Sequence, residues 1–279
     1  MGAQLTALYA SGFAELEETL RRFGLSESYF EAACSDPQLV GLSRDDLGGK
    51  PESRVRELVL GECFFRLSRA AGEAAHRLLF KAQWGYGSPD WFDHRHHYLG
   101  HEDEWTDFWT ASADNIIGVL PLGGTLLNLC AGDCFYDFYF WRRRASEIVC
   151  VDINPECHRH YLRLHQAPNI TYRLADVLTF VAPPDHFDVV VIRGAIEHFS
   201  QENQQRIFRQ ALVALKPGGW FCGDTPASRD TGVKMLDAHE FEWRDEAQMR
   251  QELSRVFGHV ETQTLVSKER TTLFWKARR

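Results

Sequence analysis

The stretch Gly-Gly-Thr-Leu-Leu-Asn-Leu-Cys-Ala-Gly-Asp-Cys (residues 123–134), followed by Ser-Glu-Ile-Val-Cys-Val-Asp (residues 146–152), decides the fold. Its first apolar run predicts a strand buried on both faces, as in a parallel sheet. At Ala131 and Gly132 the side chains nearly vanish, so a ligand can approach the backbone, and the helix expected next offers its free N–H groups. Asp152 ends a second buried strand, where a carboxylate can bind the hydroxyls of a ribose. The stretch therefore predicts a βαβ unit that binds a nucleoside.

Five short motifs resemble, in their order and spacing, those of class I S-adenosylmethionine (SAM)-dependent methyltransferases. They are Leu127–Cys134, Val151-Asp152, Ala175–Val177, Phe187–Ile192 with Ala195–Phe199, and Leu215–Gly219. The resemblance covers roughly residues 120 to 225 and implies SAM as the cofactor. It also implies an α/β fold: a seven-stranded, mostly parallel, doubly wound, Rossmann-like sheet that ends in an antiparallel hairpin.

The chain departs from the family pattern at three positions of the first motif. Asn128 stands where the family usually has an acid, and Cys130 and Cys134 stand where it usually has glycines. An amide can still form a hydrogen bond, although it lacks the charge that favours a cationic ligand. Cysteine is small enough for the turn, provided that neither position requires a positive φ.

The rest of the chain fits this sheet, preceded by a mainly helical region. Helices alternate with strands expected near residues 125–130, 147–152, 169–174, 187–193 and 219–224. A terminal hairpin is expected over Val256–Val266 and Thr271–Lys276. Upstream, a loop is expected over Asp36–Pro51, among helices predicted over Leu5–Phe23, Glu27–Cys34, Pro51–Gln83 and Asp103–Val119. We therefore expect a helical lid or substrate region, residues 1–119, and a SAM-binding domain, residues 120–279.

Composition limits the choice of function. The 279 residues are 44% hydrophobic and 25% charged, as in an ordinary soluble globular protein. A net charge of −8 argues against a broad phosphate-binding face, so we expect a small-molecule substrate and no nucleic acid. We find no apolar segment suited to a membrane span or a signal peptide, and the seven scattered cysteines indicate reduced thiols. These features favour a cytoplasmic monomer or homodimer without membrane contact.

Several residues are expected to bind the cofactor. Asp152 is the expected ribose ligand, with Ile153 beside it, and its alternative role is to cap the next helix. Asp176, with Val177, is expected to bind the adenine, unless it caps a short helix instead. The other cofactor candidates lie on the turn and at the end of the fourth strand: Asn128, Cys130, Ala131, Gly132, Asp133 and Arg193.

The catalytic candidates follow the fourth strand. Ligands of open α/β sheets lie beyond the carboxyl ends of the strands, which is where Glu197 and His198 are expected. Methyl transfer from a sulfonium requires donor and acceptor to be held in line, and a base where the acceptor is a hydroxyl or an amine. Glu197 and His198 are thus candidates for a catalytic or substrate-orienting pair, and a purely structural role is equally open.

The segment from Trp84 to His101 combines aromatic residues, glycines and histidines. We expect it to fold over the donor as a lid and to form part of the acceptor pocket, the alternative being a fixed hydrophobic seam. His94 is a candidate general base, because the pKa of histidine lies near working pH. The segment's histidines and acids also suggest a metal site, but the usual zinc spacings are missing, so we expect no metal.

The sequence therefore predicts a SAM-dependent methyltransferase that acts on a small molecule, such as a natural-product or sugar-type metabolite. The alternative is a protein that binds SAM or S-adenosylhomocysteine without catalysis, as a sensor or scaffold. A nicotinamide oxidoreductase is disfavoured because the turn lacks G-x-G-x-x-G. Whether oxygen, nitrogen or carbon receives the methyl group is left open.

Overall fold

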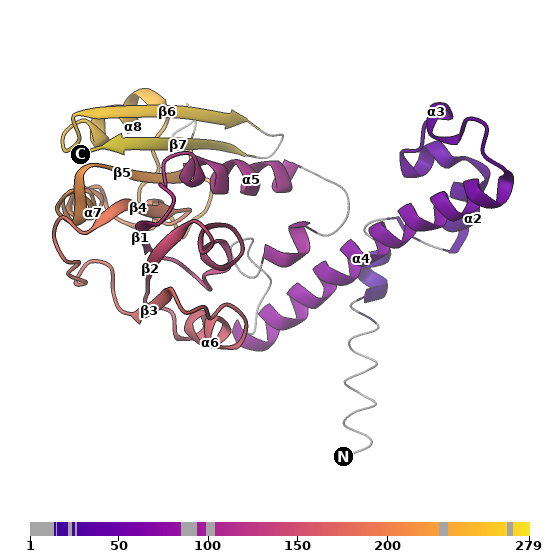
Figure 1. Cartoon of the computed structure of the whole chain (residues 1–279), viewed down its shortest axis with the longest axis horizontal. Coiled ribbons are helices and arrows are strands. Elements are labelled where there is room, and N and C mark those ends of the chain that lie inside the picture. Colours follow the sequence, from indigo (N-terminus) through magenta and orange to yellow (C-terminus); the bar gives the residue numbers. More distant parts are fainter. Residues whose placement is uncertain are drawn as a thin grey trace, which may run out of the picture. The chain divides into compact units, whose positions relative to one another are not determined.

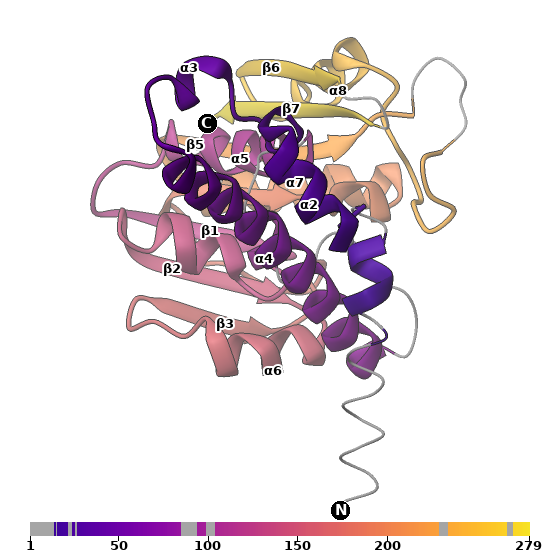
Figure 2. The ribbon, with the colours of Figure 1, turned by 90° about the vertical axis from the view of Figure 1, so that its right-hand side faces the viewer.

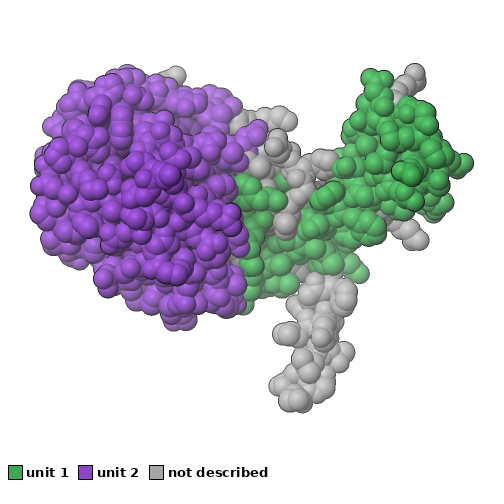
Figure 3. Space-filling view, in the orientation of Figure 1, with its two compact units in different colours: residues 1–106 green, residues 107–279 purple. Residues whose placement is uncertain are grey.

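The chain divides into two compact units, shown in different colours in Figure 3. The computed structural model describes residues 14, 16–21, 24–25, 27–84, 94–98, 104–228, 234–266 and 270–279. The first unit comprises Met1–Thr106 and the second Asp107–Arg279. Helix α5 (Glu104–Ile117), which the boundary at 119/120 assigned to the helical region, thus belongs almost wholly to the second unit.

The first unit is helical in its described part. Its elements are α2 (Glu27–Ser35), η1 (Pro37–Val40), α3 (Arg44–Leu47), α4 (Glu52–Trp84) and η2 (His94–Tyr98). Residues 36–51, expected to be a loop, contain two short helices because each has its own cap. Asp36 accepts a hydrogen bond from the Gln38 N–H, and Ser43 forms a capping box with Asp46. A small core of Ala33, Val40, Val59 and Cys63 joins α2, η1 and α4.

The second unit is built on a seven-stranded sheet of order β3-β2-β1-β4-β5-β7-β6. Its strands are β1 (Gly124–Leu129), β2 (Ala145–Asp152), β3 (Ile170–Leu174), β4 (Phe187–Arg193), β5 (Leu215–Pro226), β6 (His259–Val266) and β7 (Thr271–Arg278). The first five are parallel, and β7 runs antiparallel to both β5 and β6. Figures 1 and 2 show β6 and β7 at one end of the sheet and β3 at the other. The predicted fold class is confirmed.

Helices cover both faces of this sheet. Leu127, Leu129 and Ile192 belong to a core shared with α7 (Gln201–Ala214) and α8 (Glu246–Leu253). On the other face, Asn128 bonds to Asp137, and α5 joins the same layer through Asn115, whose side-chain amide donates to Gly223 of β5 and Trp275 of β7. The strand order reverses between β2-β1 and β1-β4, and ligands of such sheets bind at the carboxyl ends of the strands at this switch point.

The helix predicted after the first strand is short. It contains the π-helical turn η3 (Asp137–Trp141), in which Arg142 N–H donates to Asp137 C=O across five residues. The wider turn places the Asp137 side chain inward, where it is almost fully buried, and Trp141 is fully buried beside it. Helix α6 (Pro155–Leu164) follows β2 as a regular helix.

Two further expectations concern membranes and thiols. Among the described helices, none combines the length and the apolar character needed to cross a membrane. All seven cysteines are free thiols, as expected.

Candidate active site

The turn after β1 has left-handed backbone at three positions. The φ angles are 56° at Cys130, 57° at Gly132 and 61° at Cys134. A Cβ built on Gly132 meets no atom within 4 Å, so this side of the turn is open to a ligand. The condition under which the two cysteines fit without strain is not met, since both lie at positive φ. Each costs about 1–2 kcal/mol relative to a residue in the right-handed region.

Asp152 secures the turn from the end of β2. Its Oδ2 accepts a hydrogen bond of 2.8 Å from Gly132 N–H, and its Oδ1 accepts one of 2.8 Å from Asn154 N–H. From β3, the Tyr172 hydroxyl donates to Gly132 C=O over 3.1 Å. Burial raises the pKa of Asp152, and the backbone donors oppose this rise. Each carboxylate oxygen keeps a second lone pair, which a ribose hydroxyl can use.

Three of the predicted acids converge on the Cys130 thiol. Burial, reinforced by the negative charges of Asp152, Glu197 and Asp176 in that order, raises the pKa of this thiol far above its ordinary value. These residues follow three different strands, so the carboxyl ends of β2, β3 and β4 meet around the turn. The predicted donor site and the predicted acceptor site are therefore neighbours.

Glu197 and His198 lie in η4 (Ile196–His198), directly beyond β4. Glu197 is 3% exposed, and its Oε2 accepts a 2.9 Å hydrogen bond from the Thr225 hydroxyl at the end of β5. Burial raises the pKa of Glu197 to about 7, although its own backbone N–H and Thr225 act in the opposite direction. His198 is exposed, and its ring lies 4.8 Å from that of His239, centroid to centroid.

Comparison with known proteins identifies this arrangement. Residues 126–219 match the family model described as a methyltransferase domain. Over these residues the chain resembles a methyltransferase domain. No curated protein matches the chain.

Solved structures share the fold of this methyltransferase domain at low sequence identity. A SAM-dependent methyltransferase from Mesorhizobium loti is 19% identical, with a TM-score of 0.50 over 61% of this chain and 97% of its own. A phosphoethanolamine N-methyltransferase from Haemonchus contortus, bound to phosphomonomethylethanolamine and S-adenosylhomocysteine, is 14% identical, with a TM-score of 0.53 over 63% and 53%. A possible exported protein from Bordetella parapertussis is 17% identical, with a TM-score of 0.53 over 96% of both chains.

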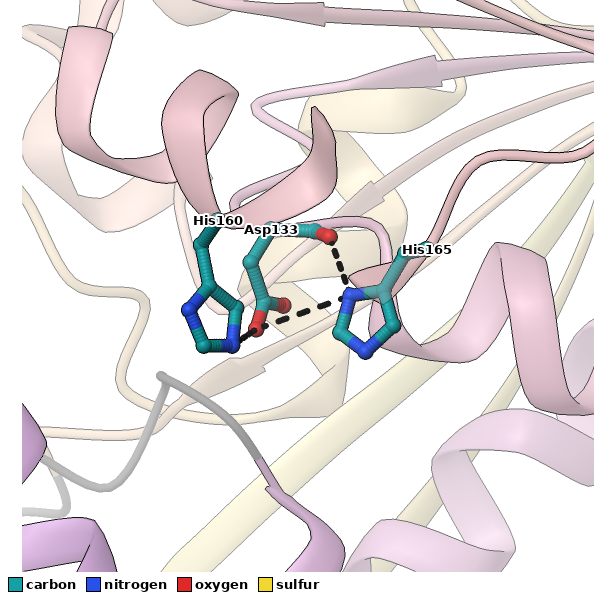
Figure 4. A group of neighbouring side chains, drawn as sticks. All are labelled: Asp133, His160 and His165. Atoms are coloured by element: carbon teal, nitrogen blue, oxygen red, sulfur yellow. Dashed lines mark hydrogen bonds and ion pairs between the residues drawn. The ribbon is translucent and has the colours of Figure 1, made fainter. Parts of the chain in front are cut away.

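Asp133, a cofactor candidate, is directed into the methyltransferase domain's interior. Figure 4 shows its carboxylate between His160 of α6 and His165, both buried. The Asp133 Oδ2 lies 3.6 Å from His160 Nε2, and its C=O lies 2.7 Å from His165 Nδ1. The side chain therefore braces the turn from α6, and only its backbone can border the open side at Gly132.

Asn128 is also committed to an internal partner. Its side-chain amide donates to Asp137 Oδ2 over 2.9 Å, and both residues are buried. Burial raises the pKa of Asp137 to about 6, while the hydrogen bonds from Asn128 and Cys150 and the charge of Arg193 act against this rise. The acid that the family usually has at position 128 is thus replaced by an amide paired with an acid nine residues later in the chain.

The residues predicted to bind adenine border the end of β3. The Asp176 Oδ1 accepts a 2.8 Å hydrogen bond from Leu178 N–H, which closes a turn at residues 177–179 and not the helix considered as its alternative. Its Oδ2 is not engaged by this bond. Val177 is buried in the core, whereas Ile153 is 66% exposed although it is apolar. An exposed Ile153 beside Asp152 offers the kind of surface on which an adenine ring can lie.

Arg193, the last cofactor candidate, closes the end of β4. Its Nε donates to the Ser112 hydroxyl over 2.6 Å and forms an ion pair of 3.3 Å with Asp224. Its guanidinium carbon lies 3.8 Å from the centre of the Tyr136 ring, which allows a cation–π contact. The Arg193 Nη2 is buried and, within the described part of the chain, has no hydrogen-bond partner.

The third catalytic candidate, His94, lies in η2 of the first unit and is buried. Residues 85–93 and 99–103, which carry most of the predicted lid, lie outside the described residues. The lid hypothesis and the role of His94 are therefore still predictions.

Three residues that contribute to the site were not predicted from the sequence: Tyr172, Thr225 and His239. Tyr172 lies on β3 and pairs with Cys150 of the neighbouring strand β2. Thr225 directly follows Asp224, the residue of β5 that pairs with Arg193 of β4. Once the strand order is known, the first two are predictable from register alone. His239 is not, because it lies beyond β5 in irregular structure.

Proposed function

We propose that this protein transfers the methyl group of SAM to a small-molecule acceptor. The observation that carries the proposal is the left-handed turn at Gly132, held by Asp152, within residues that match a methyltransferase domain. The turn leaves open space above Gly132, and the Asp152 carboxylate beside it would bind the ribose hydroxyls.

The donor would lie across the ends of β1, β2 and β3. Asp152 would bind the ribose hydroxyls with its remaining lone pairs, while Ile153 and Asp176 would border the adenine. The buried Arg193 Nη2 has no hydrogen-bond partner among the described residues, and the carboxylate of the donor's methionine part would supply an acceptor for it. Asn128 and Asp133 would act indirectly, by fixing η3 and the turn.

The acceptor would lie beyond β4 and β5. Glu197 is the only one of the predicted catalytic residues that is both buried and directed at the neighbouring strand end, through Thr225. It would orient the acceptor or take its proton, and His198 would border the pocket from its exposed side. A small acceptor is supported by the net charge of −8, which disfavours polyanionic partners.

The test of this proposal is calorimetry with SAM, S-adenosylhomocysteine and NAD. Both SAM-derived ligands should bind to the wild-type protein, and NAD should not. Asp152→Ala should weaken their binding by about 2–3 kcal/mol, because it removes charge-assisted hydrogen bonds to the ribose. Binding of NAD alone, or an unchanged affinity in a folded Asp152→Ala variant, would contradict the proposed donor site.

The helical N-terminal region is proposed to supply the lid. Hydrogen exchange with and without S-adenosylhomocysteine tests this role, since a lid at residues 84–101 gains protection when the ligand binds. Equal protection in both states, together with full activity of a variant in which His94, His96 and His97 are alanines, would exclude both the lid and the histidine base.

A further inference from the structure

Three clusters of described residues hold potential metal ligands, one atom per residue, within 4.8 Å of one another. They are Asp133 with His160 and His165, Cys134 with Asp137 and Cys150, and Glu197 with His198 and His239. We propose that the third cluster binds a divalent first-row transition-metal ion at the acceptor side of the sheet. Binding of the ion does not depend on methyl transfer, whereas its role toward an acceptor rests on the proposed function.

Both histidines of this cluster have a partner on their Nδ1 atom. His239 Nδ1 donates to the buried carboxylate of Glu242, and His198 Nδ1 lies 3.3 Å from the Ala238 C=O. These contacts fix the tautomer in which Nε2 of each ring carries the free lone pair. Metal-binding histidines nearly always donate their other ring N–H to a carboxylate or a backbone carbonyl in this way. The outer shell of a metal site is thus present around the two imidazoles.

The segment that carries His239 is tied to the one that carries Glu197. The Glu197 C=O accepts hydrogen bonds from Glu240 N–H (2.8 Å) and Phe241 N–H (3.1 Å). The Glu242 carboxylate, besides holding His239, accepts from Met235 N–H over 2.8 and 3.0 Å. The ligands therefore come from two segments fixed by backbone contacts, so that little reorganisation is needed on binding. Around a tetrahedral ion with bonds near 2.1 Å, ligand atoms lie about 3.4 Å apart, which is about 1.4 Å less than the 4.8 Å limit within which the three atoms lie here.

The other two clusters are less suited to a metal. In the first, all three residues are buried, so a substrate could not reach an ion bound there. In the second, Cys134, Asp137 and Cys150 are also all buried. The third cluster differs because His198 is exposed while its partners are buried. An ion bound there is reachable by a substrate.

The donor set indicates the class of ion. Two imidazoles and one carboxylate suit Zn²⁺, Mn²⁺, Fe²⁺ or Co²⁺ and are too few and too nitrogen-rich for Ca²⁺. With three protein ligands, at least one position stays open for an oxygen of the acceptor. An ion in this place would act as a Lewis acid and lower the pKa of a bound hydroxyl. A hydroxylated or carboxylated acceptor is the chemistry that such a site would select.

The experiment is a Co²⁺ titration of the full chain after treatment with a chelator, followed by visible absorption and calorimetry. We expect saturable binding of one ion. Glu197→Gln, which keeps an acceptor for Thr225, and His239→Gln should abolish it. Glu242→Gln touches only the outer shell and should weaken it by about 10–100-fold. Thermal melts establish that each variant is folded. If His239→Gln does not fold, the Co²⁺ affinity of Glu197→Gln decides the test.

Two matched controls locate the ion. His259 lies 3.1 Å from Glu261 as an exposed histidine–carboxylate pair, so His259→Ala should leave the affinity unchanged. His165→Gln alters the first cluster and should also leave it unchanged. Absence of saturable Co²⁺ binding, or wild-type affinity in a folded Glu197→Gln variant, overturns the proposal. Loss of binding in His165→Gln alone would overturn it as well. Asp152→Ala should bind Co²⁺ normally, which separates this test from that of the donor site.

Discussion

Replacing Cys130 by glycine and, separately, by alanine tests the strain in the donor turn. Both variants remove the thiol, so the packing that is lost nearly cancels between them. At φ 56°, alanine keeps the left-handed penalty of about 1–2 kcal/mol, and glycine does not. Glycine in turn loses about 0.5–1 kcal/mol through the greater freedom of its unfolded chain. The glycine variant should therefore be the more stable of the two by about 0.5–1 kcal/mol.

This order is the reverse of the usual one, which makes its sign informative. Cys157 in α6 is the control, since it has helical backbone; its side chain is buried, whereas that of Cys130 is half-buried. There the alanine variant should be more stable than the glycine variant by about 1 kcal/mol. Guanidinium unfolding followed by the fluorescence of the buried tryptophans measures both differences. A Cys130→Ala variant as stable as Cys130→Gly, or more so, would refute the left-handed assignment at this position.

Two further predictions concern the same end of the sheet. Gly132→Ala should cost only about 0.5–1 kcal/mol of stability, because φ is 57° at this position but the added Cβ meets no other atom. The same Cβ should enter the space of the ligand and weaken S-adenosylhomocysteine binding at least tenfold, which calorimetry measures. Asp137→Asn should remove a pH dependence of stability. The pKa of Asp137 is raised in the folded state to about 6 from an ordinary 3.8, so the stability it contributes is full below pH 3.8 and is lost as the pH rises through 6, by at most about 3 kcal/mol. Denaturant unfolding of both proteins at pH 5 and pH 8 measures this effect. The stability of Asp137→Asn relative to the wild type should be greater at pH 8 than at pH 5, and an equal difference at both pH values would contradict the prediction.

The fold was predictable because its signals are local. A run of apolar residues marks β4 at 187–193, and the same pattern marks the other parallel strands within a few residues. The clearest discrepancy is β5, which begins at Leu215 and not near 219. Leu215 pairs with Phe187 across an irregularity in the ladder, so the Lys-Pro-Gly-Gly turn lies inside the strand. Such pairing depends on the neighbouring strand, which no pattern within residues 215–226 reveals.

The site was predictable only where spacing determines position. Asp152 and Gly132 meet because adjacent parallel strands end at the same edge, and their separation along the chain follows from one βαβ unit. The direction of the Asp133 side chain could not be predicted from spacing. It depends on His160 and His165, two buried residues near the end of α6. Likewise, the contact of His239 with His198 joins residues 41 positions apart through an irregular segment.

At the two cysteines of the donor turn, tertiary contacts override local residue preference. From residue preferences alone, Cys130 and Cys134 favour an ordinary turn, and the left-handed geometry should have been lost with the glycines. It is kept because contacts on both sides determine it. Ala131 N–H donates to Val151 C=O, Gly132 N–H to Asp152, and Cys134 N–H to Ala131 C=O. Backbone strain of this kind persists where the surroundings over-determine a conformation, and such places tend to be functional. The retention of an unfavourable backbone beside Asp152 is therefore an argument, independent of any motif, that this turn binds a ligand.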